Sequence, residues 1–338
     1  MGILKHPKLD RLEQNVSEAL KEDLKARDEW FTEAAFDEEE LERTGAVGYS
    51  YWRSTIRAFS RNKLAMALLI LLLIVVIFTF VQPYLPNQFD PNVANNAVTS
   101  SGRPKPLKDS PPDLVHWLGT DSNGYDLWAR LWAGTRNSLF IGICVALIEA
   151  GVGILIGVLW GYVRSLDFLF TEIYNVLDNI PTTIVLILIS FILRPSMGTL
   201  IFAMSITGWI GMARFIRNQV LIIRDRDYNV ASRCLGTSTW RIIMKNLLPY
   251  LVSVIMLRMA LSIPGAIGSE VFITYIGLGL PADIPSLGKL ITEGRKLLAS
   301  PSKSYQLIYP TIVLSFVTVS FYMIGNAFSD AADPKSHV

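Results

Sequence analysis

The chain has 338 residues, of which 51% are hydrophobic and 18% are charged, with a formal net charge of +2. Such a composition is apolar for a soluble protein and is typical of a membrane protein with polar loops. The three histidines show no metal-binding spacing and Gly288-Lys289 lacks the rest of a phosphate-binding loop, so we expect no metal, no cofactor and no ATP bound by this chain.

Residues 1–60 are expected to form a cytoplasmic N-terminal tail. Acidic residues outnumber basic ones there, and apolar residues recur at every fourth position, as on one face of an amphipathic helix (Leu12, Val16, Leu20, Leu24). The start lacks the apolar core of a cleavable signal peptide. This segment is either a solvated tail or a contact for a partner subunit.

The first transmembrane helix is expected within 61–85. Basic and aromatic residues precede it without an acid among them, which is typical of the cytoplasmic flank of a span (Trp52, Arg53, Arg57, Phe59, Arg61, Lys63). The alternative of a nucleic-acid-binding patch fits less well, because the following residues 64–81 are uncharged and long enough to cross a bilayer. We expect no nucleic-acid partner.

The rest of the chain is expected to cross the membrane five more times. The stretch from Gln82 to Arg136 is polar, with equal numbers of basic and acidic residues, so the positive-inside rule places the expected loop at 86–135 outside. Residues 136–330 should hold five helices, at 138–163, 181–193, 195–213, from about 247 onward, and at 307–328. Residues 331–338 would form a cytoplasmic tail. The prediction is an all-α, multi-pass protein with six transmembrane helices and both termini in the cytoplasm.

Two charged residues fall inside expected spans. Glu149 lies in the second span and Arg258 in the fifth. Because a charge in lipid is costly, each should face protein or a wet cavity. Glu149 either lines a substrate path or is a hydrogen-bonded packing residue.

The most basic loop, at 214–245, precedes the fifth span. The small residues Ala231 and Ser232 predict a short helix with a small-residue face, and Gly236 ends or turns it. A second helix should follow and run to Pro249. Counting spans from an inside N-terminus places this loop inside, in agreement with its charge.

This loop resembles the cytoplasmic loop of ABC-importer permeases, whose pattern is Glu-Ala-Ala, three residues, Gly, nine residues, Ile, any residue, Leu-Pro. Val230-Ala231-Ser232, Gly236, Asn246 and Leu248-Pro249 stand at these positions, with Val230 and Asn246 departing from the pattern. The resemblance implies that the loop docks in a cleft of an ATPase subunit. The coupling residues it implies are Asn229, Val230, Ala231, Ser232, Leu235, Gly236, Leu248 and Pro249.

Other segments resemble the smaller, C-type permease subunit of oligopeptide, dipeptide or nickel importers. They are Leu118-Gly119-Thr120-Asp121 with Gly124, Asp126, Arg130, Gly134 and Arg136, then Gly277-Leu278-Gly279, and finally Gly325-Asn326, Asp330 and Asp333-Pro334-Lys335. The resemblance covers about residues 118–335 in family order. It implies a type I ABC-importer permease core in a bacterial or archaeal cytoplasmic membrane.

The implied function is transport without enzymatic chemistry in this chain. A homologous permease would complete the pathway, two ATPase subunits would bind ATP and Mg, and an extracytoplasmic binding protein would deliver the substrate. Peptide is favoured over nickel or a nickel chelate, because peptide systems are the commoner members and no His-rich metal path is present. Two other classes stay open: a secondary transporter driven by an ion gradient through Glu149 and Arg258, and a receptor or scaffold.

Overall fold

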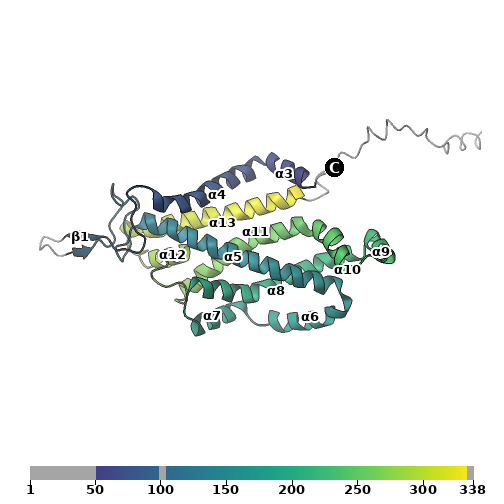
Figure 1. Ribbon diagram of the computed structural model, residues 1–338. Helices are drawn as coiled ribbons and strands as arrows, with labels where there is room; N and C mark the ends of the chain where they lie inside the picture. The colour runs from purple at the N-terminus through teal and green to yellow at the C-terminus, as the bar shows by residue number, and fades with distance from the viewer. Residues whose placement is uncertain (1–50, 99–103, 333–338) are drawn as a thin grey trace, which may run out of the picture. The chain divides into compact units, whose positions relative to one another are not determined.

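The structure is a computed structural model that describes residues 51–98 and 104–332 (Figure 1). The expected N-terminal tail up to residue 50 and residues 333–338 of the expected C-terminal tail lie outside these ranges. The described helices are α3 (Tyr51–Arg61), α4 (Lys63–Val81), α5 (Leu127–Tyr162), α6 (Arg164–Asp178), α7 (Thr182–Ile192), α8 (Met197–Arg224), α9 (Asp227–Cys234), α10 (Thr239–Ile242), α11 (Leu248–Tyr275), α12 (Leu287–Arg295) and α13 (Tyr305–Ala332).

Shorter elements join these helices. Single turns of 3-10 helix lie at η1 (Gln82–Tyr84) and η3 (Pro301–Lys303), and a π-helical turn, η2 (Ile243–Leu247), connects α10 to α11. Two short strands, β1 (Asn96–Val98) and β2 (Pro104–Pro106), pair antiparallel. The predicted all-α fold is confirmed for the bundle, and this two-stranded ribbon is an addition that the sequence did not predict.

Five of the described helices are long and apolar enough to cross a membrane: α4, α5, α8, α11 together with the short helix before it, and α13. The expected third span, at 181–193, is α7, which has only 11 residues. At a rise of about 1.5 Å per residue it cannot cross a bilayer by itself. Together with α6, from which it is bent by 73°, it passes as one broken span. The described residues thus hold five helices that could span a membrane, or the six predicted spans when this bent pair counts as one.

Several helices extend beyond the expected spans. The second span was expected from residue 138, but α5 begins at Leu127, where the side chain of Asp126 accepts a hydrogen bond from the Ala129 amide at 2.8 Å and caps the helix. Likewise α8 continues past residue 213 to Arg224. Several polar residues of these extra turns have partners in the protein: Asn137 donates to the Pro285 carbonyl and Arg217 to Asp167.

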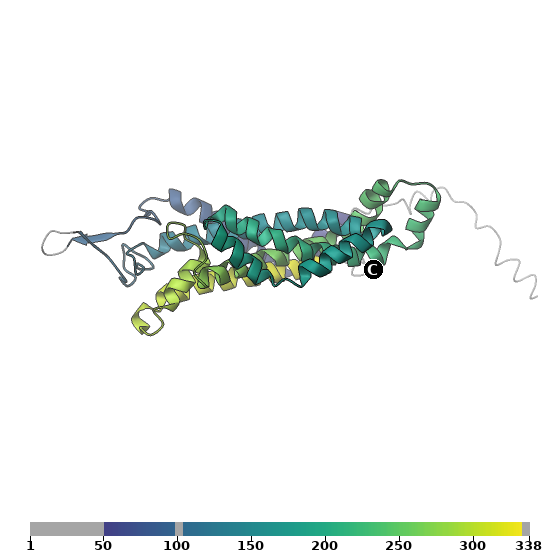
Figure 2. The ribbon, with the colours of Figure 1, turned by 90° about the horizontal axis from the view of Figure 1, so that it is seen from below.

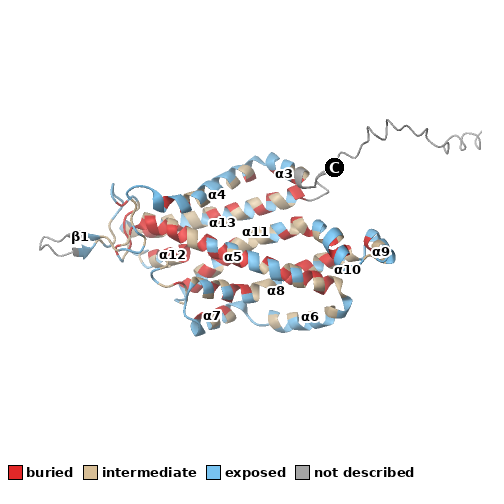
Figure 3. Ribbon diagram, viewed as in Figure 1, coloured by how far each residue is buried: buried red, intermediate tan, exposed pale blue. Residues whose placement is uncertain are grey.

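Within the bundle, α5 lies alongside α8 and α11 (Figure 1; Figure 2). Gly153, Gly157 and Gly161 face α8, where an added Cβ would come within 2.5, 2.5 and 2.8 Å of α8 atoms. Small residues thus allow the two backbones to approach closely. Buried residues concentrate along α5 and α8, whereas much of α4 is exposed and apolar, as suits contact with lipid (Figure 3).

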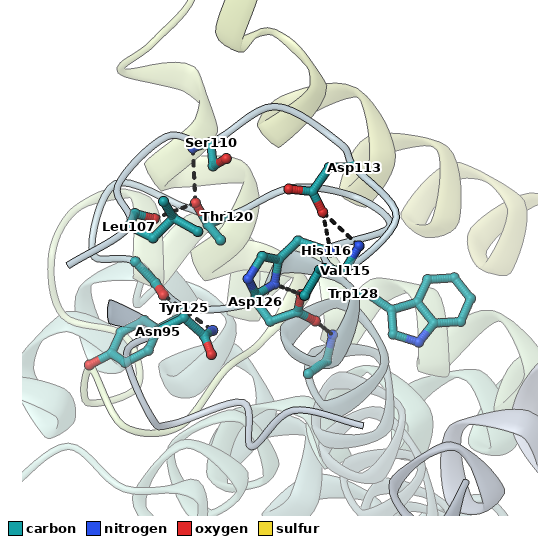
Figure 4. A network of polar contacts seen from close by, with 12 residues as sticks. Asn95, Leu107, Ser110, Asp113, Val115, His116, Thr120, Tyr125, Asp126 and Trp128 are labelled. Atoms are coloured by element: carbon teal, nitrogen blue, oxygen red, sulfur yellow. Dashed lines mark hydrogen bonds and ion pairs between the residues drawn. The ribbon is translucent and has the colours of Figure 1, made fainter. Parts of the chain in front are cut away.

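The two ends of the bundle carry different structures. The end that holds α9 and α10 is called the α9 end, and the opposite one, with α12 and the β1–β2 ribbon, the α12 end (Figure 1; Figure 2). At the α12 end the loop before α5 is tied by polar contacts (Figure 4). Asp113 accepts a hydrogen bond from the Val115 amide at 2.8 Å, and His116 Nδ1 lies 2.8 Å from Asp126 Oδ1. The loop therefore packs on the start of α5.

A buried arginine holds the same end together. Arg130 is 1% exposed, with one guanidinium nitrogen 3.4 Å from Asp121 Oδ2 and another donating to the Ala282 carbonyl at 3.3 Å. The Tyr125 ring stacks against the guanidinium, with its centroid at 4.5 Å. Arg130 thereby joins α5, the loop before it and the segment that leads into α12. These contacts give a structural reason for the spacing of Asp121, Tyr125 and Arg130 within the motif at 118–136.

Candidate functional site

The expected loop forms helix α9, a glycine turn and helix α10. The Gly236 amide donates to the Arg233 carbonyl and the Thr237 amide to the Ser232 carbonyl, both at 3.0 Å, which closes the end of α9. This pattern requires a left-handed residue after the helix, and Gly236 has φ +77°. The predicted helix, Gly turn and helix are present. The coupling role of these residues stays a prediction.

The eight candidate coupling residues do not share one surface. On α9, Val230 and Ala231 are exposed, as is Leu235 after it, at 86%. In contrast, Asn229 is fully buried and Ser232 is half-buried. Gly236 forms the turn, while Leu248 and the exposed Pro249 lie in the first turn of α11.

The exposed residues of α9 and its C-cap are Asp227, Tyr228, Val230, Ala231, Cys234 and Leu235, and we call this surface the α9 face. Its apolar members are exposed at an end that is otherwise rich in charge. Ala231 has the smallest side chain among them. Tyr228 was not among the expected coupling residues. Its spacing of three from Ala231 could have identified it, because residues three or four apart share a helix face.

The buried side of α9 is fastened by an asparagine pair. Asn229 Nδ2 donates to the Ile223 carbonyl at 2.9 Å, and Asn246 Nδ2 donates to Asn229 Oδ1 at 3.0 Å. Asn246 is one of the two positions that depart from the family pattern. The structure gives the departure a physical reason, since the amide pairs with Asn229 across the turn.

We expect Asn246→Ile to loosen α9. The exchange removes the donor to Asn229 Oδ1, and leaving a buried polar group unpaired costs about 1–3 kcal/mol. Hydrogen exchange at the α9 amides should therefore become faster, while exchange in α5 stays unchanged. Lys245→Gln, at an exposed neighbour, is the control. Equal protection of α9 in both variants would show that the asparagine pair does not hold this helix.

Arginine contacts fix α9 to the ends of α5 and α8. Arg224 donates to the Gly161 carbonyl at 2.7 Å and to Asp225 at 3.1 Å, and Arg233 donates to Asp225 at 3.2 Å. Hydrogen bonds from Arg224 and then Arg233 hold the pKa of Asp225 below its ordinary value. Asp225 is therefore ionised at neutral pH and keeps both arginines in place.

Behind this face, the loop is part of the packed core. Buried residues of α10, η2 and α11 join buried residues of α8 in one apolar cluster (Ile216, Val220, Ile223, Ile242, Ile243, Leu247, Leu251). Close-packed interiors transmit displacement instead of absorbing it. Because Asn246 of η2 is hydrogen-bonded to Asn229 of α9, α9 is connected to the start of α11 through this cluster.

Further along α11, Arg258 and Glu149 line one cavity of about 380 Å³. Side chains from α5, α7, α8, α11 and α13 surround it. Glu149 accepts a hydrogen bond from Ser262, one turn beyond Arg258, and a Cβ at Gly208 would collide with the Glu149 carboxylate. Both residues thus face a cavity within the bundle. Glu149 is also hydrogen-bonded, so the substrate-path and packing interpretations of this residue both stay open.

Sequence reasoning did not single out a buried acid of α11, Glu270. It accepts hydrogen bonds from Thr274 at 2.9 Å and Ser286 at 2.6 Å, and Ser138 lies at 3.4 Å. Ser286 also caps α12 by accepting from the Lys289 amide. These contacts join α5, α11 and α12, so Glu270 is a structural anchor of the α12 end. The signal in the sequence that could have identified Glu270 is an acidic residue within the long apolar run of the fifth span.

Comparison with known proteins identifies the family. The family described as "Binding-protein-dependent transport system inner membrane component" matches residues 153–338, and "N-terminal TM domain of oligopeptide transport permease C" matches residues 50–101. The chain is 37% identical to the oligopeptide transport system permease protein AmiD of Streptococcus pneumoniae, over 88% of this chain and 94% of that protein.

Two Bacillus subtilis proteins are similar over comparable lengths. The dipeptide transport system permease protein DppC is 35% identical over 91% of this chain and 93% of its own length. The oligopeptide transport system permease protein OppC is 33% identical over 90% and 96%. With these matches and its membrane-spanning helices, the chain belongs to the family of binding-protein-dependent transport system inner membrane components, the permeases of ABC importers.

Proposed function

We propose that this permease, together with a homologous partner permease, forms the pathway through which an ATP-driven importer carries oligopeptides or dipeptides. The observation that carries the proposal is the continuity between the α9 face and the cavity. Asn229, on the buried side of α9, is hydrogen-bonded to Asn246 of η2, η2 packs with the start of α11 in one apolar cluster, and α11 contributes Arg258 and Ser262 to the cavity. Movement at one end can therefore change the shape of the pathway.

The peptide assignment rests on the relatives. AmiD, DppC and OppC are each named for oligopeptide or dipeptide transport, and the chain covers more than nine-tenths of the length of each. This favours peptide over the nickel alternative.

The partner subunits bind ATP and deliver the substrate. Two ATPase subunits bind ATP and Mg and close on each other, and the α9 face docks in a cleft of one of them. A binding protein docks at the α12 end and delivers the peptide. The chain performs no covalent chemistry. Its mechanical task is to convert closure of the ATPases into movement of α11.

This proposal requires the α9 end to face the cytoplasm and the α12 end to face outward. We expect Ser302→Cys, at an exposed site next to α13, to react with an impermeant thiol reagent on intact cells, after Cys144 and Cys234 have been replaced by serine. Ser238→Cys, exposed beside α10, should react only after permeabilisation. Labelling of Ser238→Cys alone on intact cells would invert the orientation and remove the docking assignment.

The transport function is tested by uptake in a strain that lacks the chain. Restoring the full chain should restore uptake of a labelled tripeptide and leave nickel uptake unchanged. A strain that regains nickel but not peptide uptake would contradict the substrate assignment.

A further inference from the structure

Arg258 has an unusual environment for a charged residue in a membrane helix. Its guanidinium lies 5.7 Å from the centre of the Phe215 ring, and a Cβ placed at Gly211 would be 3.8 Å from its Nη2. Within residues 54–96 and 105–332, no hydrogen bond or ion pair holds the guanidinium, and the side chain is exposed to the cavity. An arginine at membrane depth normally has a counter-charge.

Glu149 lies on the same cavity and interacts electrostatically with Arg258, but it does not pair with it directly. Its carboxylate accepts the Ser262 hydroxyl, and no ion pair with Arg258 forms among the described residues. Gly208 leaves the space in which this carboxylate lies against α8. The cavity is therefore lined by one guanidinium and one carboxyl group that form no ion pair with each other, so both can contact a ligand.

From this arrangement we infer that Arg258 binds the carboxylate of the peptide cargo during its passage, with Glu149 facing the ammonium end. The inference rests on the proposed function. A guanidinium can donate two parallel hydrogen bonds to a carboxylate, which a compact ammonium cannot reproduce. The volume of about 380 Å³ lies in the range of about 300–1,000 Å³ typical of small-molecule pockets.

The presence of Glu149 on the same cavity also suits a site from which the cargo must be released again. A pathway must bind its cargo well enough to admit it and weakly enough to release it. Glu149 offsets part of the attraction between Arg258 and an anion, which keeps binding transient. The competing explanation is that Arg258 forms an ion pair with an acid of the partner permease, in which case it would stabilise the assembly without recognising cargo.

The test compares three peptides in proteoliposomes that contain the whole importer. One is a tripeptide with uncharged side chains and a free carboxyl terminus, the second is its C-terminal amide, and the third is an amide with an aspartate side chain. Each rate is normalised to the affinity of the binding protein for that peptide. The variants are Arg258→Gln and Arg258→Lys, with Arg194→Gln, at an exposed site between α7 and α8, as control.

We expect Arg258→Gln to reduce uptake of the free-acid peptide about tenfold or more, as for a lost hydrogen bond to a charged group. Uptake of the amide should stay close to that of the unaltered importer, and Arg258→Lys should lie between. A similar loss for the aspartate amide would show that the site accepts a carboxylate from either source, and no loss would restrict it to the terminus.

Equal loss of all three peptides in Arg258→Gln would overturn the inference and favour a structural ion pair. Unchanged uptake of all three would overturn it as well. These outcomes differ from failure of the proposed function, in which the unaltered importer itself transports no peptide.

Discussion

Gly236→Val is expected to abolish peptide uptake while the chain still reaches the membrane at normal levels. Gly236 has φ +77°, a conformation that a β-branched residue resists at a cost of about 1–3 kcal/mol. An added Cβ would meet nothing within 4 Å, so the effect comes from the backbone and not from a clash. The turn would distort, α9 and α10 would lose their mutual angle, and the α9 face would no longer fit the ATPase.

Gly236→Asn is the matched control, because asparagine adopts left-handed conformations more readily than other residues with a side chain. It should retain most ATPase association and uptake. The measurements are membrane levels, pull-down of the ATPase subunits and uptake in vesicles. Full uptake and normal ATPase binding by Gly236→Val would rule out this loop as the coupling element.

Arg130→Met should destabilise the α12 end by about 3–5 kcal/mol, the effect of removing one partner from a buried ion pair. Two acids surround the guanidinium: burial raises the pKa of Asp121, which contacts Arg130, and burial also raises the pKa of Glu293, which Arg130 stabilises electrostatically. Without the arginine, both carboxylates would lie in a poorly solvated site with less compensation. The purified protein should therefore unfold at a markedly lower temperature.

A double variant separates charge from packing in this cluster. Adding Asp121→Asn to Arg130→Met removes one of the two carboxylates that lose compensation, and the amide oxygen can still accept from the Tyr125 amide. We expect it to recover part of the lost thermal stability. Lys105→Met, at an exposed position, should have little effect. If the double variant is less stable than the single one, packing and not charge dominates this site.

The sequence predicted most spans because each leaves a local signal. Residues 64–81 are uncharged and follow basic residues, and α4 occupies nearly the same positions. The third span was different, because its length depends on the bend between α6 and α7 around Pro181. The start of α5 was mistaken for loop, since Arg130 and Asn137 look solvated in the sequence but are covered by other segments of the chain.

The candidate site was predictable only in its local part. The spacing around Gly236 predicted a helix, a turn and a helix, all of which depend on nearby residues. The Asn229–Asn246 hydrogen bond and the shared cavity of Glu149 and Arg258 depend on packing between distant segments. Sequence reasoning gave the depth of each charge in the membrane, but it could not show that they face the same cavity.

A measurement of which energy source drives uptake tests the central claim, that this chain belongs to an ATP-driven importer, most directly. The complete importer is reconstituted in proteoliposomes with its binding protein, and uptake of a labelled tripeptide is measured with ATP supplied to the ATPase side or with a proton or sodium gradient alone. We predict uptake that requires ATP and persists when ionophores abolish the ion gradients. Uptake that follows a gradient without ATP or the ATPase subunits would contradict the account and favour a secondary transporter.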